Sequence, residues 1–301
     1  MVKSCAMNLG GTKSGARLPL ASALIAAALC GCSLRSLALR STASLIEAGI
    51  PASYRESDPD LAQDAMPAQL KLMETLLESA PSNPALLKSL GEGFVGYAFL
   101  FVEDDQPDRA RGLYLRAASY ALRLAALNPA LRDLGRPDAG DLEPALKQAR
   151  REDVPALYWA AYAWAGWADL SKDDPDALAA LPKASKLMAK ALELDPAFQH
   201  GGPDLWFGVY YAARPKIAGG DLEKAKAHFE AALARSGGKY LMAKLLYAKY
   251  YALGALDRGL FSKLNSEVLS TRADALPEAR LANEVAKRKA KKLLEKIDEL
   301  F

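Results

Sequence analysis

The sequence predicts an all-α protein, and two observations support this fold class. From Leu61 onward, alanine and leucine are frequent, and proline and glycine fall mainly at the ends of segments with helical apolar periodicity. No convincing run of alternating β-branched residues indicates a strand. We therefore expect tetratricopeptide-like helical hairpins, in several degenerate repeats, that stack into a short solenoid.

A small–large–small pattern at positions i, i+4 and i+7 recurs along the chain, and residues with this spacing share one helix face. The clear copies are Ala110, Tyr114 and Ala117; Ala184, Met188 and Ala191; and Ala225, Phe229 and Ala232; a weaker copy is Ala68, Leu72 and Thr75. The copies begin at residues 68, 110, 184 and 225 and are therefore 42, 74 and 41 residues apart. Strict tetratricopeptide repeats recur about every 34 residues. We expect hairpins with longer loops, and a Pro- and Gly-rich connection, 128–153, that separates two halves of the solenoid.

The stretch from His200 to Tyr251 indicates how the helices begin and end. Glycine pairs at 201–202, 219–220 and 237–238 can adopt positive φ angles and end helices at little cost. Asp204 and Asp221 stand where the following helices need an N-cap oxygen. We therefore predict that both aspartates are N-caps.

Residues 1–31 have the features of a signal peptide. Three basic residues and no acidic one precede an apolar run, 18–29, that is too short to cross a bilayer as a helix. The run ends in Leu29-Cys30-Gly31-Cys32, which resembles a bacterial lipoprotein signal. This resemblance implies cleavage before Cys32 and lipidation of Cys32, and Ser33 at the next position favours the outer membrane. The alternative is an ordinary secretory signal with two incidental cysteines.

We divide the chain into the signal peptide, 1–31, a lipid-anchored tether with one packed helix, 32–60, and a helical-repeat domain, 61–301. Loss of the signal peptide removes three of the 39 basic residues and leaves 36 against 36 acidic residues. A near-neutral domain argues against a nucleic-acid partner. Cys32 is then the only cysteine, so the exported domain has no disulfide and depends on its core.

Short motifs along the chain occur in an order shared with a known family. The motifs are Gly96-Tyr97-Ala98-Phe99, Val102-Glu103-Asp104-Asp105, Tyr158-Trp159, Gly201-Gly202, Tyr210-Tyr211, Gly219-Gly220-Asp221, Tyr250-Tyr251 and Leu281-Ala282-Asn283. This series, which covers roughly residues 60–300, resembles the TRAP transporter T-component family. His200 departs from the pattern, because an aromatic or small residue is expected before the glycine pair.

The resemblance implies an outer-membrane-linked lipoprotein built of tetratricopeptide-like helices. It also implies association with a periplasmic TRAP-type solute-binding protein. The family resemblance further implies a homotrimer that encloses a hydrophobic channel or cleft.

Aromatic residues gather in the second half of the chain and are our candidates for an apolar ligand cavity with a few hydroxyl groups. All four tryptophans fall within 48 residues, and positions 159, 164 and 167 do not share one helix face. The candidates are Trp159, Tyr162, Trp164, Trp206, Tyr210, Tyr211, Tyr247 and Tyr250, with Arg214 as an anchor for a carboxylate or an acidic partner. The alternatives are ordinary core packing for each ring and, for Arg214, a cation that satisfies carbonyls at a helix C-terminus.

The sequence offers no catalytic residue, metal site or cofactor site. His200 and His228 have no second ligand at helical spacing, and HExxH, CxxC and GxSxG motifs are absent. The segment 91–96 matches GxGxxG, but it lies within a predicted helix, where close helix packing explains the glycines.

We therefore expect a non-catalytic, periplasm-facing lipoprotein that associates with a TRAP-type solute-binding protein and binds or passes a small apolar or amphipathic ligand. One alternative is a tetratricopeptide scaffold for outer-membrane or envelope assembly. Another is a hydrolase that uses scattered carboxylates.

Overall fold

Helices joined by turns make up the part of the chain that the structure describes. The computed structural model describes residues 49–136 and 140–301, and within these ranges it contains no strand. The predicted all-α fold is therefore confirmed for these residues. The predicted signal peptide, 1–31, and the predicted lipidation site, Cys32, lie outside the described residues and stay predictions.

The helices follow one another with mostly short connections. In chain order they are α2 (Pro59–Ser79), α3 (Pro84–Tyr97), α4 (Pro107–Ala125), α5 (Glu143–Leu146), α6 (Val154–Asp169), α7 (Pro175–Leu194), α8 (Phe198–Ala212), α9 (Leu222–Arg235), α10 (Leu241–Leu246), α11 (Arg258–Ser270), α12 (Arg280–Glu295) and α13 (Ile297–Leu300). Two π-helical segments, η1 (Ala98–Val102) and η5 (Tyr247–Ala252), extend α3 and α10. A short helical segment, 49–54, precedes α2 and belongs to the predicted tether.

Side-chain oxygens cap several of these helices at their N-termini, which satisfies backbone N–H groups of the first turn. The capping residues are Asp58, Asn83, Asp174, Asp221 and Asp257. Asp221 accepts from the backbone N–H of Lys224 at 3.1 Å, as predicted. The prediction for Asp204 is wrong. Asp204 lies inside α8, and its buried carboxylate contacts His228 and Arg235 of α9 instead of its own helix end.

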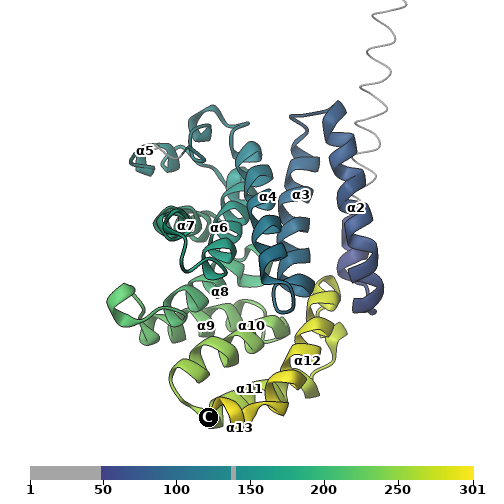
Figure 1. Ribbon diagram of the computed structural model, residues 1–301, viewed down its shortest axis with the longest axis vertical. Coiled ribbons are helices and arrows are strands. Elements are labelled where there is room, and N and C mark those ends of the chain that lie inside the picture. Colours follow the sequence, from purple (N-terminus) through teal and green to yellow (C-terminus); the bar gives the residue numbers. More distant parts are fainter. Residues whose placement is uncertain (1–48, 137–139) are drawn as a thin grey trace, which may run out of the picture. The chain divides into compact units, whose positions relative to one another are not determined.

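Neighbouring helices pack in pairs. The helices α2, α3 and α4 lie side by side, and α6 packs against both α4 and α7 (Figure 1). Because α4 and α6 touch directly, the connection 128–153 does not separate two halves of the domain. One hydrophobic core extends from Leu70 to Phe207 and a second from Leu205 to Ala290, so the division falls within α8. Stacking of the hairpins into a tetratricopeptide-like solenoid remains a prediction.

The small–large–small faces form contacts between the packed helices. Every residue of the three clear copies is at most 1% exposed, which confirms those faces. The weaker copy is wrong, because Leu72 is 54% exposed and both Ala68 and Thr75 are exposed. The helix α2 buries Leu70 and Leu77 instead, since these residues face α3.

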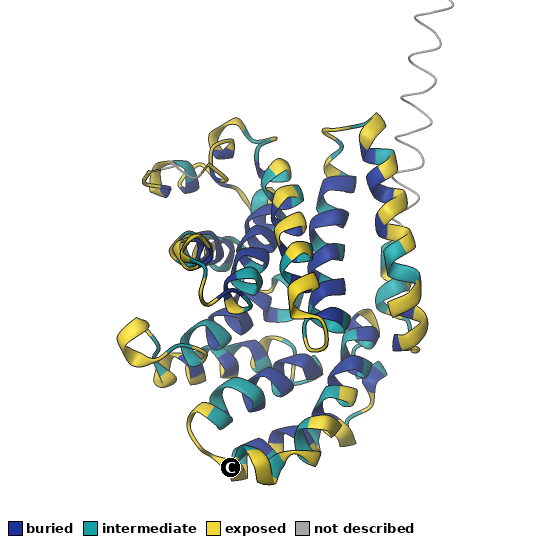
Figure 2. Ribbon diagram, viewed as in Figure 1, coloured by how far each residue is buried: buried dark blue, intermediate teal, exposed yellow. Residues whose placement is uncertain are grey.

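The helix α3 is central to the first core. Within the described residues, Pro84–Val102 is the one segment long and apolar enough to cross a membrane, and 56% of it is buried. The helices α3 and α6 are buried over most of their lengths (Figure 2). Because α2, α4 and α6 all contact α3, its apolar composition is explained by its place in the core.

The last long helix returns to the first one. Arg288 of α12 donates to both carboxylate oxygens of Asp60 in α2, at 2.5 and 3.1 Å. Lys289 pairs with Asp104 at 2.7 Å and donates to the carbonyl of Phe99 at 3.0 Å. Asp60 and Arg288 are 228 residues apart in the sequence, so these contacts join the two ends of the helical domain.

A candidate ligand cavity

A cavity of about 470 Å³ lies where the two ends of the helical domain meet. Its walls come from the segment 49–54, α2, α3 with η1, α6, the start of α8, Tyr240 just before α10, and the stretch from Pro277–Ala279 (η7) into α12. Sites for small organic molecules commonly have volumes of about 300–1,000 Å³. By its size, this cavity is the candidate site.

Apolar side chains supply most of the cavity wall. The aromatic members are Tyr54, Phe99, Tyr158, Trp159, Tyr162 and Tyr240. The larger aliphatic members are Ile50, Met66, Leu70, Met73, Val95, Leu100 and Leu281. Polar groups interrupt this wall at only a few places, among them Glu92, Gln199 and His200. An apolar wall with a few polar groups suits a ligand that is itself mainly apolar.

Glycines of α3 explain why space remains beside the helix. A Cβ atom on Gly96 would meet no atom of the described residues within 4 Å, and Gly96 lines the cavity. A Cβ atom on Gly93 would lie 2.7 Å from Cδ2 of Leu70, and one on Gly91 would lie 3.5 Å from Ala121. Helix packing therefore explains Gly91 and Gly93, as predicted, whereas Gly96 borders open space.

The π-helical segment η1 brings two further side chains to the cavity. It continues α3 directly, and its residues Phe99 and Leu100 line the wall. The extra residue of a π-helical turn shifts the side chains that follow it to a new face, and such turns occur frequently at functional sites. The edge of the Phe99 ring meets Tyr162 of α6, with 5.8 Å between ring centroids.

Glu92 of α3 is the carboxyl group most deeply placed in this wall. Its Oε1 atom accepts from the hydroxyl of Tyr54 and from Nε2 of Gln199, the latter at 2.7 Å. Burial raises the pKa of Glu92 above its usual range, although Tyr54, Lys88 and Gln199 each oppose that shift. Burial, and then the charge of Glu92, raise the pKa of Tyr54. The carboxyl of Glu92 is therefore bound by neutral donors inside an apolar wall.

An unusual backbone conformation brings Gln199 and His200 to the same site. Gln199, His200 and Gly201 have φ angles of 48°, 60° and 87°, all in the left-handed region. This region is unfavourable for residues other than glycine by roughly 1–2 kcal/mol each. The His200 ring packs on Tyr240 with 5.3 Å between centroids, and burial lowers the pKa of His200. Strained residues of this kind are concentrated at functional sites.

Tyrosine hydroxyls and one indole complete the polar part of the wall. Burial raises the pKa of Tyr240 to about 12 and raises the pKa values of Tyr158 and Tyr162 well above the usual range. All three hydroxyls therefore stay protonated. Among the described residues, Nε1 of Trp159 has no hydrogen-bond partner, although only 8% of Trp159 is exposed.

Two of the nine residues predicted from the sequence line this cavity, Trp159 and Tyr162. Trp164 is buried in the first core. Trp206 and Tyr210 stack on each other with centroids 4.7 Å apart, and Tyr211 stacks on His228. These rings pack around α8 and are not part of the cavity wall.

The remaining three predicted residues also lie away from the cavity wall. Tyr247 stacks on Phe229 with centroids 4.8 Å apart, and Tyr250 lies in η5 near the second core. Arg214 lies above the Tyr210 ring and donates to the carbonyls of Tyr210 and Gly219, at 2.9 and 3.3 Å. Arg214 thus satisfies one carbonyl in the last turn of α8 and one in the loop that follows, in line with the alternative interpretation of this residue.

Sequence reasoning missed Tyr54, Glu92 and Gln199. The clearest overlooked signal is Glu92, because it is the only acidic residue in the apolar segment Pro84–Val102. An acidic residue in a core helix needs a partner or a function. Tyr54 and Gln199 are distant in sequence and give no comparable local signal.

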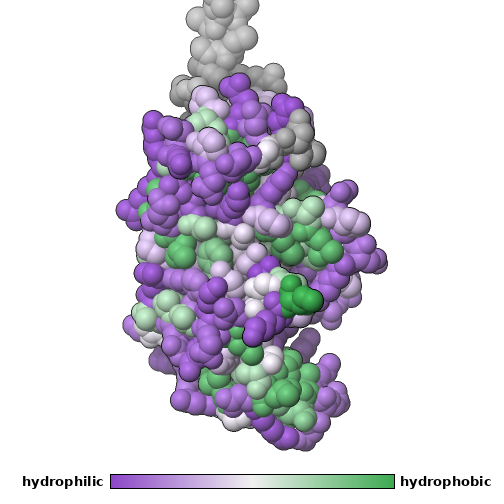
Figure 3. Space-filling view, turned by 90° about the vertical axis from the view of Figure 1, so that its left-hand side faces the viewer, coloured by the Kyte–Doolittle hydropathy of each residue, from purple (hydrophilic) through white to green (hydrophobic). Residues whose placement is uncertain are grey.

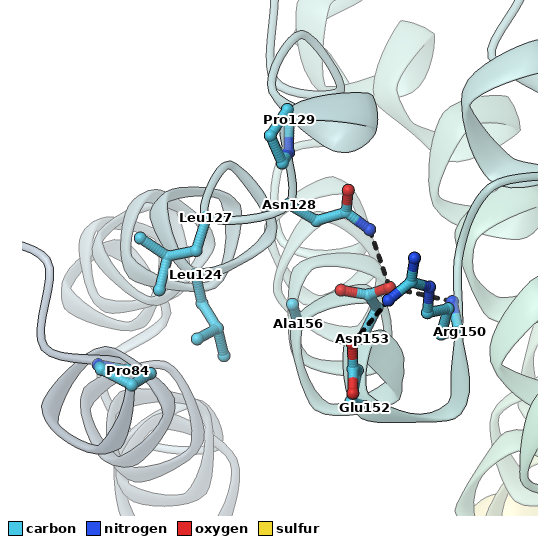
Figure 4. A pocket seen from close by; sticks show the side chains of 9 residues that line it. All are labelled: Pro84, Leu124, Leu127, Asn128, Pro129, Arg150, Glu152, Asp153 and Ala156. Carbon is cyan, nitrogen blue, oxygen red and sulfur yellow. Dashed lines mark hydrogen bonds and ion pairs between the residues drawn. The ribbon is translucent and has the colours of Figure 1, made fainter.

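A second, more open pocket of about 380 Å³ lies between the ends of α3 and α4 and the start of α6. Figure 4 shows its charged side chains turned toward one another. Asp153 accepts from Nδ2 of Asn128 at 3.0 Å and from the backbone N–H of Arg150 at 2.9 Å. Because these groups already satisfy one another, this pocket has a weaker claim to be a binding site.

On the side that Figure 3 shows, hydrophobic residues form separate patches among hydrophilic ones. Ile217, in the loop between α8 and α9, is 98% exposed, but isolated apolar residues are common on protein surfaces. Within the described ranges, no three His, Cys, Asp or Glu side chains converge in a way that could hold a metal ion.

In the part of the chain that the structure describes, the protein is all-helical and has a mainly apolar cavity beside α3. The family model of the TRAP transporter T-component matches residues 55–301, so the chain belongs to that family. A protein of Treponema pallidum (strain Nichols), described as an uncharacterized protein, is 27% identical over 304 residues. The match covers 90% of this chain and 93% of that relative. Family membership makes this chain a transporter component and indicates a periplasmic or membrane-associated location.

Proposed function

We propose that this protein is a non-catalytic lipoprotein that faces the periplasm and associates with a TRAP-type solute-binding protein. In this proposal Cys32 carries the lipid, the outer membrane is the anchoring membrane, and the protein assembles as a homotrimer. The cavity binds or passes a small apolar or amphipathic ligand. Membership in the TRAP transporter T-component family supports the transport role.

The observation that carries the ligand-binding part is the cavity itself. About 470 Å³ of space lies beside Gly96, between rings of four separate segments. The space is partly open to solvent, so water can reach its apolar wall. An apolar ligand that fills it would remove that wall from water and contact several rings at once. These features favour a binding site.

The association is tested by purifying the tagged full-length protein from its native envelope and identifying the bound proteins by mass spectrometry. We expect a TRAP-type solute-binding protein in near-equal amount. Recovery of outer-membrane assembly components without a solute-binding protein would contradict the proposal and favour the scaffold alternative. Cys32→Ser is the matched variant for the anchor, and it should shift the protein from the membrane fraction to the soluble periplasmic fraction.

Ligand binding is tested with decanol as an apolar probe, measured by isothermal titration calorimetry. We expect binding to the wild-type protein and its loss in Gly96→Leu, because the new side chain extends into free space in the cavity. Gly112→Leu is the matched control. Gly112 lies in α4, is exposed, and would likewise accept a Cβ atom with no neighbour within 4 Å. Equal binding by both variants would show that the probe binds elsewhere.

A further inference from the structure

The charges of the cavity wall are of one sign. Two carboxyl groups, those of Glu92 and Glu278, belong to the lining, and none of the described lining residues is a lysine or an arginine. Lys88 lies one helical turn before Glu92, and its charge lowers the pKa of Glu92, but Lys88 does not line the cavity. An anionic ligand would therefore lose its hydration without gaining a direct cationic partner.

The same wall also contains aromatic rings, and the charge of Glu92 acts on the hydroxyls of two of them, Tyr54 and Tyr158. Tyr158 and Trp159 are in contact with 4.7 Å between centroids, and Tyr162 lies 6.0 and 6.1 Å from them. The hydroxyl of Tyr54 contacts the Glu92 carboxyl directly. Electron-rich ring faces attract cations, and aromatic cages of this composition bind amines and quaternary ammonium groups. A carboxyl group next to such rings adds a direct charge partner.

The state of Glu92 makes it a suitable partner for a cation. Its carboxyl is held by two neutral donors, Tyr54 and Gln199, so no cationic side chain neutralises it by direct contact among the described residues. The charge of Lys88 and the two neutral hydrogen bonds offset the cost of dehydrating this carboxylate only in part, since burial still raises its pKa. A cation brought in by a ligand would reduce that cost, whereas an uncharged ligand head would leave it.

We propose that this cavity selects amphiphiles with a cationic amine or ammonium head, which contacts Glu92 and the neighbouring aromatic faces while the apolar part fills the space beside Gly96. This proposal rests on the proposed function, in which the cavity binds a ligand. It adds the charge of the ligand head, which the shape of the cavity alone does not determine.

The test compares three probes with the same alkyl chain: decyltrimethylammonium, decanol and decanoate, each below its micelle concentration, by calorimetry with the full-length protein. We expect decyltrimethylammonium to bind at least about tenfold more tightly than decanol, and decanoate to bind most weakly. In Glu92→Gln, the ratio of the affinity for decyltrimethylammonium to that for decanol should fall about tenfold. In Glu278→Gln it should change by less than about twofold, because Glu278 is exposed and solvent screens its charge.

The outcomes separate the two proposals. Binding of decanol without any preference for the ammonium probe would overturn the charge selection and leave the ligand cavity intact. Failure of all three probes to bind would overturn both the charge selection and the assignment of the cavity as a ligand site. A preference that survives in Glu92→Gln would also overturn the assignment to Glu92. If that variant does not fold by circular dichroism, the affinity order of the three probes on the wild-type protein decides. If this affinity order persists in high salt, the result supports a charge contact inside the cavity. If the order is lost in high salt, the preference comes from surface attraction only and the proposal is overturned.

Discussion

Glycine has opposite roles in two regions of the molecule, the cavity beside Gly96 and the interface between α8 and α9. At the α8–α9 interface a Cβ atom on Gly208 would lie 2.9 Å from the ring of Phe229, which is fully buried. The glycine is needed there because a large side chain fills the space opposite. A Cβ atom on Gly96 would meet nothing within 4 Å in the described part of the chain. Glycine therefore permits dense packing in one region and leaves room in the other.

Two carboxyl groups, one in each region, differ in a similar way. Asp204, at the α8–α9 interface, contacts Nδ1 of His228 at 2.9 Å and Nε of Arg235 at 2.7 Å. Burial acts to raise the pKa of Asp204, but His228 and Arg235 outweigh it and lower the pKa. Among the described residues, Glu92 has only neutral donors in direct contact, and burial raises its pKa. The interface is thus complete within the protein, whereas the cavity has space and a carboxyl group left for another molecule.

The largest expected difference between the two regions is in how much stability is lost when an aromatic ring is removed. Phe229→Ala should lower the free energy of unfolding by about 3–5 kcal/mol, because a fully packed ring leaves a void behind. Phe99→Ala should lower it by only about 1–2 kcal/mol, because one side of that ring already borders the cavity. Urea unfolding followed by circular dichroism measures both values. Equal losses would show that the cavity region is packed as densely as the interface.

The same glycine substitution should have opposite effects in the two regions. Gly208→Ala should destabilise the protein by about 1–3 kcal/mol, because the new methyl group collides with the Phe229 ring. Gly96→Ala should stabilise it by about 0.5–1 kcal/mol, since alanine favours the helix and meets no neighbour. The midpoints of thermal unfolding give both signs. A loss of stability in Gly96→Ala would contradict the open space beside α3.

The two carboxyl groups should give stability profiles of opposite slope with pH. Between its ordinary pKa of 4.5 and its raised folded value, Glu92 binds more protons in the folded state than in the unfolded state. The free energy of unfolding therefore falls as pH rises through that window, by about 1.4 kcal/mol per unit of pKa difference, and Glu92→Gln should remove this fall.

Asp204 contributes stability above its ordinary pKa of 3.8, and this contribution is lost as pH falls through its lowered folded value. Asp204→Asn should therefore destabilise the protein near neutral pH and lose less stability on acidification. Urea unfolding at about pH 3, about pH 5 and about pH 8 measures both variants against the wild type. If the free energy of unfolding of Glu92→Gln falls with pH as steeply as that of the wild type between about pH 5 and about pH 8, the raised pKa of Glu92 is contradicted.

The smallest expected effect is at Trp159. Trp159→Phe removes an indole N–H that has no partner among the described residues, so stability should change by less than about 1 kcal/mol. Trp159→Ala, which also removes the ring, serves as the comparison and should cost more. A loss in Trp159→Phe as large as in Trp159→Ala would show that the N–H has a partner in solution, such as a bound water molecule.

The sequence predicted the fold better than the site because the two depend on different distances along the chain. Helical periodicity is local, and it identified the buried faces around Tyr114, Met188 and Phe229. The face around Leu72 was wrong because α2 packs on one side only, and spacing does not indicate which side. Asp204 was wrong because its partners lie on another helix. Local patterns do not contain this information.

The cavity was harder to predict because it joins side chains from distant segments. Trp159 and Tyr162 were found because the aromatic residues of α6 are concentrated in a short stretch. Tyr54 and Gln199 reach Glu92 from 38 and 107 residues away, and nothing near them in the sequence indicates this meeting. The concentration of aromatic residues also continues into α8, where the rings fill the core and do not line the cavity.

The ion pair between Asp60 and Arg288 bears on the order in which the chain folds. Local helical hairpins such as α8 with α9 can form as soon as both helices exist, whereas contacts across 228 residues must wait for almost the entire chain. Leu281 and Ala282, near the start of α12, belong to the cavity wall together with Ile50. During synthesis or export from the N-terminus, the cavity therefore lacks one part of its wall until α12 has packed in place. Its apolar lining is exposed throughout that interval, and a chain that stops short of α12 would present this lining to chaperones and proteases.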